Sequence, residues 1–175
     1  MKKITLLAMS FMMALMVKAQ DAGTDITSTF TNTDFEGGNG TSGWTSTGVG
    51  PATIGTAAEN NYQGTTFMET WTPSSGNLGN FDWSQTQEVP NGYYVVKALA
   101  HAIKQNQATT PESKGVYFYA EDAQVEIKST VAEEYSLLVK VTDGTLTIGY
   151  RAVSCNVNWT ACDYFRIIQC YGDTD

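Results

Sequence analysis

The stretch that decides the fold runs from Tyr135 to Cys170 and reads YSLLVKVTDGTLTIGYRAVSCNVNWTACDYFRIIQC. Apolar and polar side chains alternate through 135–141 and again through 145–150, which is the period of a strand with one buried face. Asp-Gly at 143–144 stands between these segments, and both residues tolerate the backbone of a tight hairpin turn. A third alternating segment, 161–168, follows a polar loop. The stretch therefore predicts three antiparallel strands.

Asp163 is the odd residue in this alternation. By period, it shares a strand face with Phe165 and Ile167, whose side chains should point into a core. A buried carboxylate is costly unless something pairs with it. Two explanations stay open: Asp163 lies just outside the core and holds backbone donors of the loop, or it ligates a cation.

The first nineteen residues have the pattern of a secretory signal peptide. Two lysines precede an apolar run at 4–17, and Val-Lys-Ala at 17–19 resembles a small-residue cleavage site. The run is short for a membrane span. We therefore expect 1–19 to be removed, and the mature chain to be secreted, periplasmic or exposed on the outer cell surface.

The mature chain, 20–175, has the length of one domain and a strongly acidic composition. Its roughly 156 residues suit a single hydrophobic core. Ten basic residues less the three lysines of the signal peptide leave seven against 18 acidic ones, a net charge of −11. Such a surface repels nucleic acid and anionic lipid, and it suits a neutral ligand, a cation or a cationic partner.

Short alternating segments recur along the rest of the chain. They are separated by turns rich in Gly, Asn, Ser and Pro, and no segment has the period of an amphipathic helix. Eight or nine such strands predict an all-β protein, an antiparallel β-sandwich that is best described as a jelly roll occupying 20–175. Among three cysteines, Cys155 and Cys162 flank one short loop and are the first candidates for a disulfide in an exported chain.

Five groups of motifs occur in order along the mature chain. They are N-T-D-F-E at 32–36 with Trp44 after a Gly-rich loop, F-D-W-S-Q-T at 81–86 with P-N-G-Y-Y-V-V at 90–96, V-Y-F-Y-A at 116–120, T-D-G-T-L-T-I-G at 142–149, and N-W-T-A-C-D-Y-F-R-I at 158–167. Together they resemble the galactose-binding-like carbohydrate-binding modules of secreted Bacteroidetes proteins. The resemblance implies a β-jelly-roll that usually carries a structural calcium and often binds sugar. Tyr164 departs from it, because Asn is usual in the D-N-F-R ending.

The chemistry-bearing residues argue against catalysis. His101 is the one histidine of the chain, and no G-x-S-x-G, H-E-x-x-H or Gly-rich phosphate loop accompanies it. Acidic pairs at 121–122 and 133–134 fall near expected turns, whereas a glycosidase needs two carboxylates that face one glycosidic bond. We therefore expect a protein that is not an enzyme.

Glu36 and Asp163 are candidate ligands of a structural calcium. They come from opposite ends of the chain, and the first and last strands of a jelly roll can lie side by side. Calcium accepts six to eight oxygens in loose geometry, so two carboxylates with backbone carbonyls would suit it. The resemblance implies the same metal. The alternative is that both carboxylates cap backbone donors.

Aromatic side chains indicate two candidate sugar-binding surfaces. Sugar rings have apolar faces that pack on aromatic planes, with polar groups at the rim. One candidate is a strand face on which alternation places Lys97, His101, Tyr117 and Tyr119. Trp83 is a further candidate for this face. The other is a loop rim that carries Trp71 and Trp159. Rigid strand residues favour the first surface, and Gln85, Asn158 and Arg151 are candidates for the polar contacts.

The sequence thus predicts a secreted, non-catalytic module that binds a polysaccharide or glycan. The alternative is a structural or protein-interaction jelly roll at the cell surface that has no sugar site. An aromatic platform with convergent polar groups would favour the first function, and a flat acidic surface would favour the second.

Overall fold

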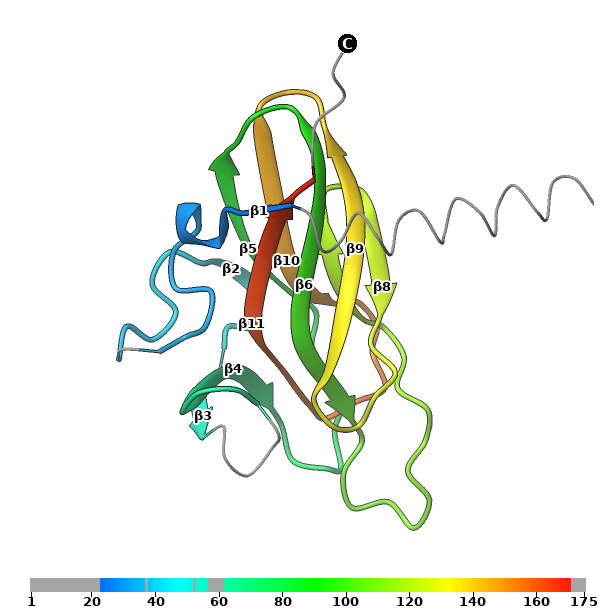
Figure 1. Ribbon diagram of the computed structural model, residues 1–175. Coiled ribbons are helices and arrows are strands. Elements are labelled where there is room, and N and C mark those ends of the chain that lie inside the picture. Colours follow the sequence, from blue (N-terminus) through cyan, green and yellow to red (C-terminus); the bar gives the residue numbers. More distant parts are fainter. Residues whose placement is uncertain (1–22, 37, 52, 57–61, 171–175) are drawn as a thin grey trace, which may run out of the picture.

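The protein forms two antiparallel β-sheets that face each other around one core (Figure 1). The computed structural model describes residues 23–36, 38–51, 53–56 and 62–170. The expected signal peptide, 1–19, lies outside the described residues. Within the described part of the chain, no helix is long and apolar enough to cross a membrane.

The first sheet, sheet A, has the strand order β3–β4–β11–β6–β9, with β1 paired to β11. Its strands are β1 (Thr24–Asp25), β3 (Thr53–Thr56), β4 (Thr66–Trp71), β6 (Gly92–Ile103), β9 (Glu133–Val141) and β11 (Trp159–Gln169). A short 3-10 helix, η1 (Thr27–Thr29), follows β1.

The second sheet, sheet B, has the order β2–β5–β10–β7–β8. Its strands are β2 (Thr45–Gly48), β5 (Phe81–Glu88), β7 (Val116–Ala120), β8 (Ala123–Glu126) and β10 (Thr145–Ala152). From β4 to β11 the chain crosses repeatedly between the two sheets. The predicted antiparallel β-sandwich of the jelly-roll class is therefore confirmed.

The predicted hairpin at Asp143-Gly144 is wrong in its pairing. The flanking strands exist, but β9 pairs with β6, whereas β10 pairs with β5 and β7. The turn itself is as expected: Gly144 has a φ of 80°, and the Thr145 amide donates to the Asp143 carboxylate at 3.2 Å. The turn therefore connects sheet A to sheet B. Local turn chemistry is the same for a hairpin and for this crossing, so the sequence signal does not distinguish them.

Large aromatic side chains fill the space between the sheets. The largest fully buried ones include Trp83, Tyr94, Phe118, Tyr150 and Phe165. Trp83 stacks on Phe81 with ring centroids 4.2 Å apart, and its indole N–H donates to the Val49 carbonyl at 3.0 Å. Burial of an apolar side chain of this size contributes about 1.5–3 kcal/mol. Trp83 is thus a core residue, and its prediction as a sugar contact is wrong.

The three cysteines are buried free thiols. The predicted Cys155–Cys162 disulfide is therefore wrong. Cys162 packs in the core cluster from β11, and the Cys155 thiol lies 3.5 Å from the Leu78 carbonyl. Closeness in sequence says nothing about the direction in which the two side chains point, and here both are used for packing.

Candidate functional site

The two ends of the domain meet where the N-T-D-F-E loop lies against β11. The Phe165 amide donates to the Thr33 carbonyl at 2.9 Å. Phe165 also packs against Trp44 and Phe35, with centroid distances of 4.8 and 6.4 Å. The predicted approach of the first and last segments is confirmed, and it brings Glu36 to the same region as Asp163.

A β-bulge in β11 explains why Asp163 did not fit the alternation. The pairing of β11 with β6 changes register between Asp163 and Arg166. Before the bulge, Ala161 packs in a cluster on the outer side of sheet A, and after it Phe165 packs in the central core. Tyr164, inside the bulge, has a φ of 51°. The expectation that Asp163 and Phe165 share a face is therefore wrong, because the extra residue shifts the phase.

The Asp163 carboxylate is buried and only half satisfied. Its Oδ1 accepts the Tyr164 amide at 2.7 Å, whereas its Oδ2 has no hydrogen-bond partner. Burial raises the pKa of Asp163 to about 8, and the negative charges of Glu36 and Asp34 add to this effect. A buried carboxylate oxygen without a donor is rare and costly, and it marks a place where a cation would be stabilised.

Glu36 is, by contrast, already well supplied with donors. Its carboxylate accepts the amides of Thr65 and Thr66 at 2.6 and 2.9 Å, and also the Thr65 hydroxyl. These hydrogen bonds lower the pKa of Glu36. Gly64 permits this close approach, since a Cβ there would overlap the Glu36 carboxylate and its φ is 68°. The Glu36 carboxylate therefore caps backbone donors, whereas the Asp163 carboxylate does so through one oxygen only.

A metal site at this place would need backbone oxygens as well as carboxylates. Among the described residues, no group of three or more His, Cys, Asp or Glu side chains is placed to hold a metal ion. Asp163 and Glu36 would supply two acidic ligands, and a hard cation such as calcium accepts carbonyl oxygens for the rest. The donor set fits calcium better than zinc, which prefers nitrogen and sulfur.

The outer face of sheet B carries two ladder rows of polar and aromatic side chains. In the first row, strand register places Thr47, Asp82, Arg151, Tyr117 and Glu126 side by side across five strands. In the second row, register places Thr45, Ser84, Gly149, Tyr119 and Gln124 side by side. We call the group of Asp82, Tyr117, Tyr119, Gln124 and Arg151 the Tyr119 face.

Tyr119 is the centre of this surface. Its ring lies over Gly149, where a Cβ would overlap the ring and the hydroxyl. Its hydroxyl donates to the Asp82 carboxylate at 2.6 Å, and the Arg151 guanidinium lies 4.7 Å from its ring centroid. Arg151 also donates to the Gln124 side chain. Burial and the Asp82 carboxylate both raise the pKa of Tyr119. The four side chains therefore hold one another in a fixed arrangement.

A surface pocket adjoins the Tyr119 face. Its volume is about 260 Å³, and its lining includes Thr47, Asn80, Asp82 and Arg151. Asp82 and Arg151 thus belong both to the first ladder row and to the pocket wall. Tyr117, beside Arg151 in that row, is half-buried. The arrangement offers a carboxylate, a guanidinium and an aromatic side chain to one ligand.

The predicted strand face of Lys97, His101, Tyr117 and Tyr119 is not one surface. Lys97 and His101 belong to sheet A, whereas both tyrosines belong to sheet B. Alternation assigns a residue to one side of its strand, and it does not say in which sheet the strand lies. Tyr119, a candidate sugar contact, is only 6% exposed, because Arg151 lies over its ring.

His101 is buried rather than solvent-exposed, although it does point away from the central core. Tyr62 covers it, with its hydroxyl 2.6 Å from Nδ1, and the Trp159 ring packs edge-on at 4.2 Å. Nε2 has no hydrogen-bond partner, and burial lowers the pKa of His101 to about 3. The buried position of His101 therefore does not suit a sugar contact, because Tyr62, from a segment far away in sequence, covers it.

Trp71 and Trp159 do come together on the outer side of sheet A. They are directly opposite in the pairing of β4 with β11. Trp71 is 56% exposed, and the Trp159 indole donates to the Glu69 carboxylate at 2.5 Å. The two tryptophans therefore remain a second candidate surface, on the opposite side of the sandwich from the Tyr119 face.

Two of the predicted polar contacts are structural instead. Gln85 is buried and exchanges two hydrogen bonds with the backbone of Thr31. Asn158 is buried and binds Thr72 and Gln105 in two loops. Asp82 and Gln124 were missed by sequence reasoning. The alternation of 81–86 does place Asp82 on the outward face, and that signal would have found it.

Comparison with known proteins identifies solved structures that have a similar fold. No family model and no curated protein matches the chain. Among solved structures, TmCBM61 in complex with β-1,4-galactotriose is 21% identical, with a TM-score of 0.62 over 81% of this chain and 97% of that one. A family 16 carbohydrate-binding module is 14% identical, with a TM-score of 0.55 over 81% and 99%. The chain has the β-sandwich fold of carbohydrate-binding modules.

The same fold also occurs in proteins with other names. A cyclase from Fischerella sp. TAU is 15% identical, with a TM-score of 0.58 over 87% of this chain and 100% of that one. At such identities the likeness concerns the fold alone. Function must therefore be argued from the side chains of this chain.

Proposed function

We propose that the mature chain is an exported, non-catalytic module that binds a neutral polysaccharide or glycan on the Tyr119 face. The observation that carries this proposal is the fixed group of Tyr119, Asp82 and Arg151 beside an open pocket. Side chains that already hold one another lose little freedom when a ligand binds. A surface whose donors and acceptors are pre-arranged suits a ligand covered with hydroxyl groups.

Each member of the face has a chemical role in this proposal. The Asp82 carboxylate accepts, and the Arg151 guanidinium donates, hydrogen bonds to sugar hydroxyls, and charge-assisted bonds of this kind are stronger than neutral ones. Tyr117, which is half-buried, offers its ring to the apolar face of a sugar. Tyr119 acts as a positioning residue, because its ring carries Arg151 and its hydroxyl holds Asp82.

The shape of the surface favours a chain over a single sugar. The ladder rows run across all five strands of sheet B, and the pocket adjoins the first row at one side. We propose that several sugar units lie along the rows, with one unit in the pocket. The acidic net charge of the mature chain suits a neutral glycan and disfavours an anionic one.

A structural calcium completes the proposal. Asp163 supplies a buried, half-satisfied carboxylate, and Glu36 supplies a second charge nearby. When bound, the cation neutralises charges that otherwise lie in a poorly solvated place. It would thereby fix the N-T-D-F-E loop to β11.

Two of the acidic residues considered for catalysis have other partners. The Glu121 carboxylate accepts the Thr147 amide at 2.5 Å, and Glu134 forms an ion pair with Lys97 at 3.0 Å. His101 is buried beneath Tyr62. These contacts favour a binding function over hydrolysis, which needs acids that face the substrate.

The test uses the mature chain, 20–175, and a panel of neutral glycans that includes β-1,4-galactotriose. Calorimetry should detect binding to at least one glycan, and chromatography after overnight incubation should recover that glycan unchanged. Failure to bind any member of the panel would favour the interaction-domain alternative. Shortened glycans would contradict the non-catalytic function.

A further inference from the structure

Strand β9 forms one edge of sheet A. It pairs along its length with β6, and no other strand among the described residues pairs with its free side. Such an edge presents a row of backbone donors and acceptors to any strand that approaches it. At nine residues, β9 is long for an edge strand.

The sequence of β9 is complementary to itself in the antiparallel direction. If two copies pair about a two-fold axis at Leu137, Glu134 of each copy lies opposite Lys140 of the other, and Ser136 lies opposite Leu138. Residues that are directly opposite in an antiparallel pair point to the same side. Both charge pairs would therefore form on the outer side of sheet A, where Glu134 already binds Lys97 at 3.0 Å.

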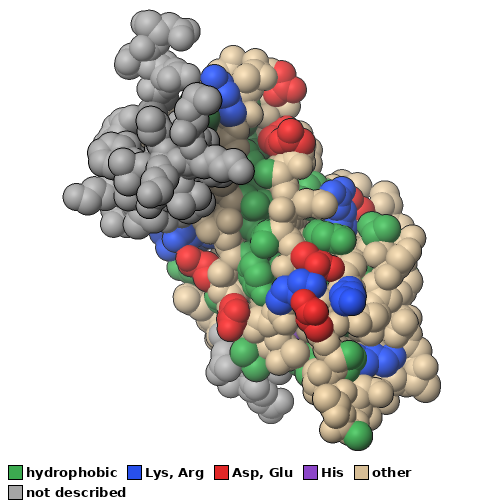
Figure 2. All heavy atoms as spheres, turned by 90° about the vertical axis from the view of Figure 1, so that its right-hand side faces the viewer, with side chains coloured by type: hydrophobic (Ala, Val, Ile, Leu, Met, Phe, Trp, Pro, Cys, Tyr) green, Lys and Arg blue, Asp and Glu red, His purple; other side chains and the backbone are tan. Residues whose placement is uncertain are grey.

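An apolar seam lies between β9, the edge of sheet A, and β8, the edge of sheet B. Ala123 and Val125 of β8 and Tyr135 and Leu137 of β9 are only partly buried, although they pack on the core. Leu138 is 40% exposed. Figure 2 shows hydrophobic side chains in a stripe down this side, with basic and acidic side chains on either side of it. A second copy placed at β9 would remove part of this apolar surface from water.

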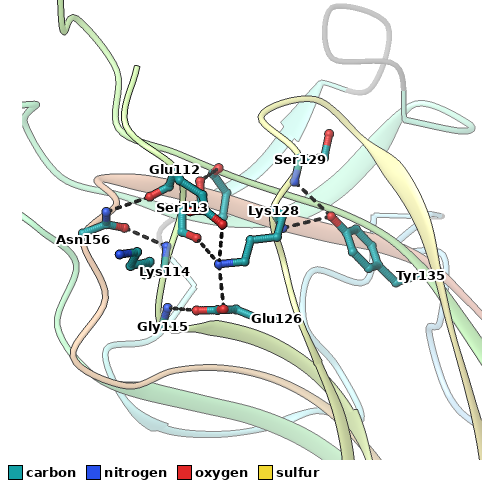
Figure 3. Close-up of polar contacts among 10 residues, drawn as sticks. Glu112, Ser113, Lys114, Gly115, Glu126, Lys128, Ser129, Tyr135 and Asn156 are labelled. Carbon is teal, nitrogen blue, oxygen red and sulfur yellow. Dashed lines mark hydrogen bonds and ion pairs between the residues drawn. The ribbon is translucent and has the colours of Figure 1, made fainter. Parts of the chain in front are cut away.

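The start of β9 is held firmly. The Tyr135 hydroxyl accepts the amides of Lys128 and Ser129 at 3.1 and 3.0 Å (Figure 3). Lys128 in turn forms ion pairs with Glu126 and Glu112 at 2.7 and 3.1 Å. An edge that is already ordered loses little entropy when a partner strand pairs with it.

We propose that two copies of this chain pair through their β9 edges, so that their A sheets join into one continuous sheet. Charge complementarity selects the register, because a shift by two residues would lose both Glu134–Lys140 pairs. The dimer would place two glycan-binding surfaces on one particle. The pairing itself needs no ligand, so it stands or falls independently of the proposed function.

The experiment measures self-association of the mature chain by sedimentation equilibrium over a range of protein concentrations. The wild type should form a reversible dimer. Glu134→Lys and Lys140→Glu each replace two attractive pairs by two repulsive ones, and each should raise the dimer Kd at least about tenfold. The double variant Glu134→Lys with Lys140→Glu restores opposite charges across the axis and should dimerise like the wild type.

A matched control is Glu88→Lys, which makes the same change of net charge as Glu134→Lys at an exposed position in sheet B. It should leave the dimer Kd unchanged, and thermal melting should show that every variant is folded. A wild type that stays monomeric throughout would overturn the proposal. So would single variants that dimerise normally, or a double variant that does not recover.

Discussion

The ring of Tyr119 lies across Gly149 in the neighbouring strand, in space that any larger residue at 149 would fill. The glycine is needed for close approach, and its backbone conformation is not of the left-handed kind. Tyr119 can therefore lie flat on the sheet, reach Asp82 with its hydroxyl and carry Arg151 on its ring. The geometry of the proposed sugar surface depends on this one contact.

Gly149→Ala should therefore displace Tyr119 and weaken both stability and glycan binding. Forcing an extra methyl group into filled space costs about 1–3 kcal/mol, and the loss should appear in a urea unfolding curve. Calorimetry should show weaker binding as well, because Asp82 and Arg151 lose their support. Thr147→Ala, two residues away on the same face, is the matched control and should leave glycan binding unchanged. Wild-type binding by Gly149→Ala would mean that Tyr119 does not organise the surface.

Calcium should stabilise the protein through Asp163. A ligand that binds the native state alone raises the melting temperature by mass action, so EDTA should lower the midpoint and added calcium should restore it. Asp163→Asn should abolish this response. At pH 8 without calcium, the same variant should be at least as stable as the wild type, because it removes a buried charge. Asp122→Asn, at an exposed turn, is the control. A melting temperature that neither EDTA nor added calcium changes would exclude the calcium site.

Tyr164→Asn should stabilise the protein. Tyr164 has a φ of 51° in the β-bulge, and Asn adopts this left-handed region more readily than a bulky residue does. We expect a gain of about 1 kcal/mol in the free energy of unfolding, which is the size of typical backbone strain. Tyr164→Ala removes the same ring without the conformational preference, so it should be less stable than Tyr164→Asn. Equal stability of these two variants would show that the backbone is not strained there.

His101 should make the protein less stable as the pH falls. Burial lowers the pKa of His101 from 6.5 to about 3 in the folded state, so below pH 6.5 the unfolded chain binds a proton that the native state does not. The contribution of the neutral histidine to the free energy of unfolding is complete above pH 6.5 and is lost as the pH falls towards 3. At pH 5 the loss relative to pH 8 should be about 2 kcal/mol.

The measurement compares the wild type with His101→Asn by urea unfolding at pH 8, 6 and 5. Because both proteins contain the same carboxylates, the comparison removes the contribution of those carboxylates to the pH dependence of stability. The difference in stability between wild type and variant should shrink, or change sign, as the pH falls. A difference that is constant with pH would show that His101 titrates normally.

The sequence predicted the strands well and their neighbours poorly. Outside the β-bulge of β11, period-two alternation places residues on the correct side of their strands, as Asp82 and Tyr117 show. The alternation does not indicate which strand pairs with which. The sequence therefore predicts a hairpin at Asp143-Gly144, whereas this turn joins the two sheets. For the same reason, residues of β6 and β7 were placed on one surface although their strands lie in opposite sheets.

Long-range contacts account for the other errors about the site. Tyr62 covers His101 from a segment 39 positions earlier in the chain, and no local pattern predicts that cover. The bulge at Asp163 to Arg166 breaks an alternation that the sequence continues without interruption. The meeting of Glu36 with the Asp163 region was predicted, because both motifs belong to the ends of a jelly roll.

The most direct test is calorimetry with the best glycan of the panel on two variants. One is Tyr117→Ala with Arg151→Ala, which strips the Tyr119 face, and the other is Trp71→Ala, which removes the exposed tryptophan on the opposite side. Loss of one ring contact and one charge-assisted hydrogen bond should weaken binding at least about tenfold in the first variant. Trp71→Ala should bind like the wild type. The reverse pattern, with normal binding by the first variant and loss in Trp71→Ala, would contradict the Tyr119 face and place the site on the tryptophans.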